Sequence, residues 1–365
     1  MDSALRWVGL ALANLGQPGL RRRPRVAEEP DPRLFPQGWE DGAQAEIERA
    51  RRLGITLVTL PEDGYPPLLR ASSDPPPVLY VRGRLEADDR LAVAIVGARR
   101  ATAHGERTAA RLAEDLVARG FTIVSGLARG IDAAAHRGAL EGGGRTIAVL
   151  GCGIDRVYPR EHERLAETIA LRGAVVSELP IGTAPWKKNF PERNRLIAWL
   201  AWATVVVEAA RESGSLITGR LAADEGRMVL AVPGPPGEPN AEGTNGLLRQ
   251  GAACCRGADD VIEDLAPQIV ETAAAVSAAR SGRAHPGDRP APPSEDALPA
   301  EAGASGLSAD ERSILGSLPA ASGIGAEELA AASGLPAGRL MAALLGLELR
   351  GLVRALPGRR FMRSG

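Results

Sequence analysis

A basic loop near the middle of the chain, residues 182–195, has the side chains that a single strand of nucleic acid requires. Four cations stand against one acid in this loop, and Trp186 and Phe190 lie among them. Cations neutralise phosphates, and a base stacks on an aromatic ring. Lys187 and Lys188 are the only lysines of the chain, in which all other strongly basic residues are arginines. The loop therefore predicts a site for single-stranded nucleic acid.

Two glycine-containing turns offer further phosphate contacts. In the first, residues 97–100, a glycine opens a helix whose free N–H groups and positive dipole end attract anions. Arg99 adds a planar guanidinium to this turn. In the second, Ser125, Gly126 and Arg129 follow an apolar run, and glycine there lets the backbone approach a ligand closely. By itself the first turn is equally compatible with a tight turn that carries a solvated arginine.

Several charged residues near these turns are expected to have structural roles. Asp132 suits the first turn of a helix, and His136, four residues later, is expected to be held locally by it rather than to be catalytic. Arg193 and Arg195 are expected to pair with acids at strand ends, because a buried arginine usually needs a carboxylate. The candidate acids are Glu178 and Glu208.

The patterns that enzymes and metal sites require are incomplete. Residues 151–153 begin a dinucleotide fingerprint, but Arg156 stands where the third glycine belongs. The histidines are scattered, and no nucleophile and base match Glu208 as a catalytic acid. The cysteines fit neither a disulfide framework nor a zinc spacing. We expect them to be small, buried hydrophobic residues of a protein in a reducing compartment. They are Cys152, Cys254 and Cys255. We therefore expect a non-catalytic protein with no cofactor and no metal.

Short apolar runs separated by helical stretches indicate how these residues are positioned. Runs rich in valine and isoleucine, with amphipathic helices between them, are typical of a parallel sheet covered on both faces. The sequence thus predicts an α/β fold with an extended Rossmann-like, doubly wound, mostly parallel sheet, whose ligands bind at the carboxyl ends of the strands. The runs are Leu91–Val96, Phe121–Val124, Thr146–Leu150, Ala174–Val176, Thr204–Val207 and Met228–Val232.

Composition divides the 365 residues into four parts. Residues 1–88 are a degenerate helical region and a proline-rich connector, and residues 89–266 are the sheet-forming core. Residues 267–306 are rich in Ala, Pro, Ser and Gly and are expected to be a flexible linker. Residues 307–365 predict three short helices and a hairpin, as in a small winged-helix domain. No stretch is long and apolar enough to span a bilayer, so we expect a cytoplasmic protein without a membrane partner.

A series of short motifs in the core resembles the DNA-processing protein A family, also called DprA or Smf. The motifs follow one another in order across residues 91–256, and the segment around residues 347–353 is similar to the family's winged-helix module. The matching strings are Ile95–Arg99, Ser125–Asp132, Ala148–Gly151, Phe190–Arg195, Ser213–Thr218 and Ala231–Gly234.

The resemblance implies a dimeric core that binds single-stranded DNA and helps to load the RecA recombinase in natural transformation. It places the DNA pocket on Arg99, Gly182, Lys187 and Phe190, with Lys188 as a substitute for the first lysine. The chain departs from the family at Ala98, where a serine is usual, in residues 198–201, and in an eroded N-terminal helical domain.

Two rival functions come from other classes of protein. A nucleotide-processing N-glycosidase on a related core would need a Gly-Gly phosphate loop and paired glutamates near residues 211–218, which contain one Glu and no Gly-Gly. A transcription regulator would bind duplex DNA through its winged helix. Residues 307–365 hold seven arginines and five acids (7 − 5 = +2), which is little charge for strong duplex binding.

Overall fold

The computed structural model describes most of the chain up to residue 266 and parts of the remainder. The described residues are 3–15, 30–31, 35–266, 268, 307–319, 323–335, 340, 343–344, 346–347, 352–356 and 360–363. The chain divides into two compact units, residues 1–261 and 262–365, which are considered separately below. The linker expected over residues 267–306 lies outside the described residues, except for residue 268.

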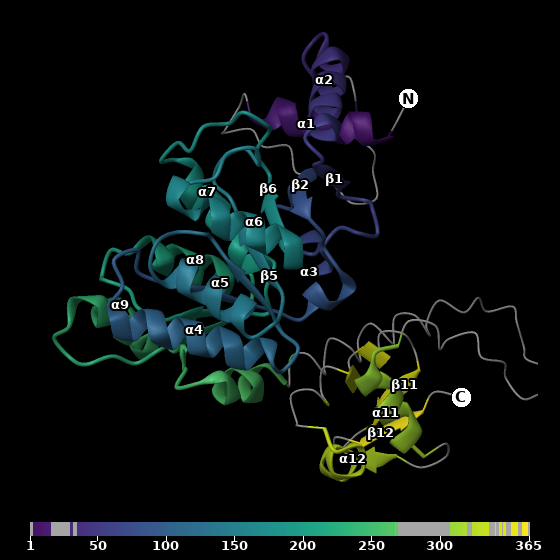
Figure 1. Ribbon diagram of the computed structural model, residues 1–365, viewed down its shortest axis with the longest axis vertical. Coiled ribbons are helices and arrows are strands. Elements are labelled where there is room, and N and C mark those ends of the chain that lie inside the picture. The colour runs from purple at the N-terminus through teal and green to yellow at the C-terminus, as the bar shows by residue number, and fades with distance from the viewer. Residues whose placement is uncertain are drawn as a thin grey trace, which may run out of the picture. The chain divides into compact units, whose positions relative to one another are not determined.

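A nine-stranded sheet forms the centre of the first unit, in the order β1-β2-β6-β5-β4-β3-β7-β8-β9 (Figure 1). Strands β3 to β9 run parallel to one another, whereas β1 and β2 form an antiparallel edge, with β2 antiparallel to β6. This confirms the predicted mostly parallel, doubly wound sheet. The strands are β1 (Thr56–Thr59), β2 (Val78–Gly83), β3 (Ala92–Val96), β4 (Thr122–Ser125), β5 (Thr146–Val149), β6 (Ala174–Ser177), β7 (Ala203–Val206), β8 (Met228–Ala231) and β9 (Ala253–Cys254).

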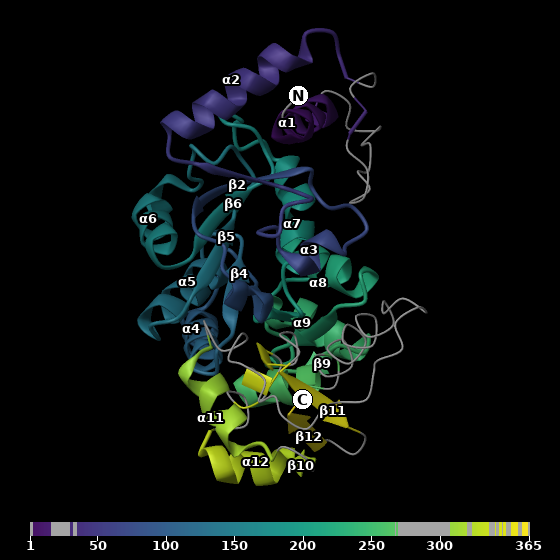
Figure 2. The same ribbon diagram turned by 90° about the vertical axis from the view of Figure 1, so that its right-hand side faces the viewer.

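Helices cover both faces of this sheet, which is why β3 to β7 are buried along their whole length. Figure 2 shows α4 (Ala103–Val117), α5 (Ile131–Glu141) and α6 (Glu163–Arg172) on one face. The other face carries α7 (Asn189–Trp199), α8 (Gly214–Asp224) and α9 (Pro239–Arg249). Helices α4 and α5 pack closely because Gly138 faces Ala110; a β-carbon on Gly138 would lie 2.1 Å from the Ala110 carbonyl oxygen.

Two helices pack beside the antiparallel edge of the sheet. They are α1 (Ser3–Leu15) and α2 (Trp39–Arg52), and Trp7 and Val8 of α1 are fully buried. Helix α2 has Glu40 and Asp41 in its first turn, where acids favour a helix. Short helices connect further strands: α3 (Pro67–Arg70), η2 (Ala87–Arg90) and η3 (Arg160–His162).

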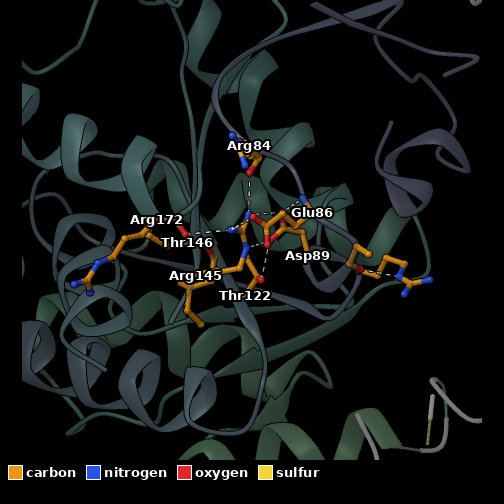
Figure 3. Close-up of polar contacts among 10 residues, drawn as sticks. Arg84, Glu86, Asp89, Thr122, Arg145, Thr146 and Arg172 are labelled. Carbon is orange, nitrogen blue, oxygen red and sulfur yellow. Dashed lines mark hydrogen bonds and ion pairs between the residues drawn. The ribbon is translucent and has the colours of Figure 1, made fainter. Parts of the chain in front are cut away.

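Arg145, immediately before β5, connects several segments at the amino-terminal edge of the sheet through hydrogen bonds and an ion pair (Figure 3). Its Nε and Nη2 donate to the two carboxylate oxygens of Asp89, each at 2.9 Å. Its Nη1 pairs with Glu86 at 3.1 Å, and the guanidinium also donates to the carbonyl oxygens of Arg172 and Arg84. All five N–H groups of the guanidinium are thus used, which makes Arg145 a structural residue.

The second unit contains a three-stranded antiparallel sheet in the order β10-β12-β11. Its elements are α11 (Ala309–Ser317), β10 (Ile324–Gly325), α12 (Ala326–Ser333), β11 (Val353–Leu356) and β12 (Arg360–Arg363). Ile314, Leu329, Leu347 and Phe361 form its core, and Ser308 caps α11. Part of the third expected helix lies outside the described residues. The described parts agree with the predicted winged helix. Within them and the first unit, no helix combines the length and apolar character that crossing a bilayer requires.

Candidate nucleic-acid interface

Phe190, in the first turn of α7, lies at the carboxyl edge of the sheet among residues from three different connections. The guanidinium carbon of Arg99, from the turn after β3, lies 5.5 Å from the centroid of its ring. The ring of Tyr158 lies 5.5 Å away, centroid to centroid, at 44°. Gly151, just after β5, lies against the ring, so that a β-carbon there would be 2.8 Å from Cδ1 of Phe190. The ring is half-buried. We call Phe190, Arg99 and Tyr158 the aromatic cluster.

The basic loop before α7 adds exposed cations to this surface. Lys187 and Lys188 are both exposed, and among the residues that the structure describes neither takes part in an ion pair. Trp186 beside them is 61% exposed, although its backbone is held by hydrogen bonds to Ala184 and Asn189. The loop thus presents two free positive charges and an aromatic ring on an ordered backbone. These are the groups that bind phosphates and bases.

Gly182 begins this loop with φ +89°, a conformation that side chains other than glycine rarely adopt. Its N–H donates to Oδ1 of Asp155 at 2.7 Å. A β-carbon on Gly182 would meet no atom within 4 Å, so the glycine is required by the backbone conformation and not by crowding. No local pattern indicates this role of Asp155, because its position against Gly182 depends on the sheet.

Helix α2 of the N-terminal region holds the residue that precedes Gly182. Oε1 of the buried Glu46 accepts a hydrogen bond from the Ile181 N–H at 2.7 Å, and Arg49 donates to the Ile181 carbonyl oxygen at 3.3 Å. Sequence reasoning left the contribution of this region open. The contacts show that it positions the basic loop, although 132 or more residues separate the partners in the chain.

The polar groups of Ser125, Gly126 and Arg129, in the second predicted turn, are already paired within the protein. Ser125 is fully buried, and its hydroxyl donates to the Ile95 carbonyl oxygen at 2.6 Å. The buried N–H of Gly126 donates to Asp132 at 3.1 Å. Arg129 is exposed but forms a bidentate pair with Glu161, at 2.6 and 2.7 Å. These three residues therefore shape the turn, and the charge of Arg129 is already opposed by a carboxylate.

The expectation that Arg193 and Arg195 pair with acids at strand ends is correct for Arg195 and wrong for Arg193. Arg195 pairs with Glu178. Arg193 does not pair with Glu208; its Nη1 donates instead to the carbonyl oxygens of Gly126, at 2.7 Å, and Val149. Burial lowers the pKa of Arg193 to about 10. Glu208 accepts hydrogen bonds from Thr102 and Asn240.

The expected pairing of Asp132 with His136 is also wrong. Asp132 accepts hydrogen bonds from the backbone N–H groups of Gly126 and Ala128, whereas Nδ1 of His136 lies 2.7 Å from the Thr146 hydroxyl oxygen. Burial raises the pKa of Asp132 and lowers that of His136 to about 3. His136 is therefore a neutral core residue. Its partner lies on the neighbouring strand β5, out of reach of local sequence reasoning.

The cysteines differ from one another. Cys152 and Cys255 are buried as expected, but Cys254 is exposed, because it lies on the short edge strand β9. Burial raises the pKa of Cys152 to about 11, so its thiol is protonated at neutral pH. Among the described residues, no three His, Cys, Asp or Glu side chains are grouped as metal ligands.

Comparison with known proteins gives consistent matches along the chain. Residues 56–266 match the model of the family described as DNA recombination-mediator protein A, and residues 289–359 match that of the DprA winged helix domain. Protein Smf of Escherichia coli is 45% identical over 210 residues. The match covers 57% of this chain and 56% of that protein, so the similarity spans little more than half of its length.

Two solved structures share both sequence and fold with the chain. The X-ray structure of DNA processing protein A from Streptococcus pneumoniae is 32% identical, with a TM-score of 0.59, and the match covers 72% of this chain and 95% of that one. DNA processing protein A from Helicobacter pylori, whose structure was described for its single-stranded DNA binding mode, is also 32% identical. Its TM-score is 0.52, and the match covers 58% of this chain and 97% of that one.

Proposed function

Because the chain belongs to the family of DNA recombination-mediator protein A, we propose that it binds single-stranded DNA at the aromatic cluster and the adjacent basic loop, without catalysis. The observation that carries this proposal is the position of Arg99 against the ring of Phe190, with Lys187 and Lys188 exposed on the same loop. A base stacks on Phe190 while the cations contact the flanking phosphates. Gly182 and Asp155 keep the loop in place.

The binding is dominated by phosphates and does not depend on base sequence. Each phosphate that is neutralised releases counterions, so affinity falls steeply with salt. Stacking of one base on Phe190 contributes roughly 1–3 kcal/mol. Ser125 and Gly126 act through the shape of the turn, and Arg129 contributes to the surface only as a partner of Glu161.

We further propose a cellular role and an assembly that follow from the family. The chain acts in the cytoplasm as a homodimer, protects incoming single strands during natural transformation, and helps to load the RecA recombinase onto them. In this arrangement residues 1–88 position the DNA site, residues 89–266 form it, and residues 267–306 link it to the winged-helix-like domain over 307–365. Homologous recombination then uses the loaded strand.

Fluorescence anisotropy of a labelled oligonucleotide tests the DNA site directly. Wild type is expected to bind the single strand tightly with a steep salt dependence, and the duplex much more weakly. The Arg99→Glu plus Lys187→Glu variant should lose this binding while remaining folded, as shown by circular dichroism. Arg220→Glu plus Arg249→Glu is the matched control, because both arginines are exposed near the distal ends of α8 and α9.

Equal loss of binding in both double variants would contradict the site, since a general charge effect would then explain it. A wild type that ignored single strands would contradict the function itself. Nucleotides would then be screened for glycosidic cleavage.

A further inference from the structure

A cleft of about 420 Å³ opens between the carboxyl ends of β3 and β7. Strand β3 has β4 on one side and β7 on the other, and the helices that follow β3 and β7, α4 and α8, lie on opposite faces of the sheet (Figure 2). This is the switch point at which doubly wound sheets bind ligands. The volume lies within the range of small-molecule sites. The N-terminus of α8, residues 213–215, lines the cleft and has no role in the DNA site proposed above.

The N-terminus of α8 forms one wall of the cleft. Ser213 caps this helix of 11 residues, and its hydroxyl oxygen accepts from the Ser215 N–H at 3.3 Å and lies 2.8 Å from the Ser215 hydroxyl. A β-carbon on Gly214 would meet no atom within 4 Å, so a ligand has room to approach the backbone there. Free N–H groups and the helix dipole make such an end attractive to anions.

Helix α7, which packs beside α8, supplies a second indication of an anion. Arg193 lines the cleft and is only 5% exposed. Its guanidinium carbon lies 5.9 Å from the centroid of the Phe190 ring. Its Nε has no hydrogen-bond partner, and its guanidinium forms no ion pair among the residues that the structure describes. The buried Asp132 also lines the cleft, but its carboxylate accepts from two backbone N–H groups. A buried guanidinium with an unused N–H favours an anionic ligand.

The charges that face the cleft leave a net positive balance. Arg99, Arg100 and Arg193 stand against Asp132 and Glu212, which gives three cations and two acids (3 − 2 = +1). Arg99 also lies 5.5 Å from the ring of Phe190, so the cleft is continuous with the aromatic cluster.

From this continuity we infer that the cleft binds a phosphate-bearing nucleotide unit next to the base that stacks on Phe190. The phosphate contacts the N-terminus of α8 and the arginines. The inference rests on the proposed function when the ligand is part of a strand. A free mononucleotide carries the same chemistry, and the experiment separates the two sources.

The test places a carboxylate where the phosphate is expected. Ser213→Asp preserves the helix cap, because aspartate caps helices as well as serine does, so the protein should remain at least as stable. Binding of a labelled oligothymidylate should weaken by about tenfold, as for the loss of about one charged contact. The slope of log affinity against log salt should fall by about one. Ser308→Asp, the same change at the cap of α11 in the second unit, is the matched control and should bind as wild type does.

A second variant tests the opposite direction. Glu212 is exposed at the cleft, and Glu212→Gln removes a negative charge, so binding should tighten by about threefold. Calorimetric titration of thymidine monophosphate into wild type and Ser213→Asp tests whether the cleft also binds a free nucleotide.

The possible outcomes separate the two proposals. If Ser213→Asp binds the strand as wild type does, whereas Arg99→Glu plus Lys187→Glu does not, the cleft inference fails and the proposed function stands. If wild type binds no strand, the proposed function fails; binding of the monophosphate that Ser213→Asp abolishes would then support the cleft. If wild type binds neither ligand, both proposals fail.

Discussion

Replacing Gly151 by alanine should weaken DNA binding although this residue makes no proposed contact with DNA. Gly151 lies under the ring of Phe190, and a β-carbon there would stand 2.8 Å from Cδ1 and 3.1 Å from Cε1 of that ring. The 2.8 Å contact is shorter than real β-carbons make, so the ring must move. Gly151 does not adopt the left-handed conformation, and its backbone accepts alanine. The substitution therefore acts through the ring of Phe190.

The size of the effect follows from the stacking that the displaced ring loses. A well-placed stacked base contributes roughly 1–3 kcal/mol. Loss of about 1 kcal/mol of this would lower the affinity for a single strand by roughly fivefold. Overpacking at a well-filled position also lowers the free energy of unfolding, typically by about 1–3 kcal/mol. The slope of affinity against salt should not change, because no charge is altered.

A double-mutant cycle with Phe190→Ala isolates this pathway. Anisotropy titrations of wild type, both single variants and the double variant give the affinities, and urea denaturation gives the stabilities. Once the ring is absent, Gly151→Ala has nothing to displace, so it should change neither affinity nor stability further. If Gly151→Ala weakened binding fivefold in the Phe190→Ala background as well, the reasoning would be refuted, since its effect would not pass through the ring.

Three other substitutions test separate parts of the structure. Glu46→Ala leaves the buried Ile181 N–H without its acceptor, so it should weaken DNA binding severalfold without changing the salt slope. Glu46→Gln retains a carbonyl oxygen as acceptor and should bind nearly as wild type does. Anisotropy titrations in which both variants behaved alike would contradict this role of Glu46. Arg145→Lys keeps the charge but loses the planar fork on Asp89, and should lower the free energy of unfolding by about 2 kcal/mol in urea denaturation, with DNA affinity unchanged in the folded protein. Burial lowers the pKa of His136 to about 3, so this residue stays neutral in the folded protein. In the unfolded chain it takes up a proton below about pH 6.5, and the free energy of unfolding therefore falls as pH decreases from 6.5 towards 3. At pH 5 this effect of His136 lowers the free energy of unfolding by about 2 kcal/mol. His136→Gln should reduce the difference in free energy of unfolding between pH 7.5 and pH 5 by that amount. An unchanged difference would assign the pH dependence to other groups.

Much of the architecture is readable from neighbouring residues in the chain. Runs such as Leu91–Val96 must be buried on both sides to be stable, and they appear as β3 and its parallel neighbours within a residue or two. Phe190, Lys187 and Lys188 also share one short loop, so their proximity follows from the sequence alone. The predicted pairing of Arg195 with an acid at a strand end is confirmed by its contact with Glu178, and the two residues flank the same connection.

Other features depend on which distant segments the sheet brings together. Arg193 was expected to pair with an acid at a strand end, but the sheet order places it beside the carbonyl oxygens of Gly126 and Val149 instead. Gly151 and Tyr158 meet Phe190 only because β5 ends, and α7 begins, at the same edge of the sheet. A strand or helix reveals itself by a pattern of burial repeated over a few residues. The partner of one side chain depends on strand order and on contacts across a hundred residues or more, which no local pattern contains.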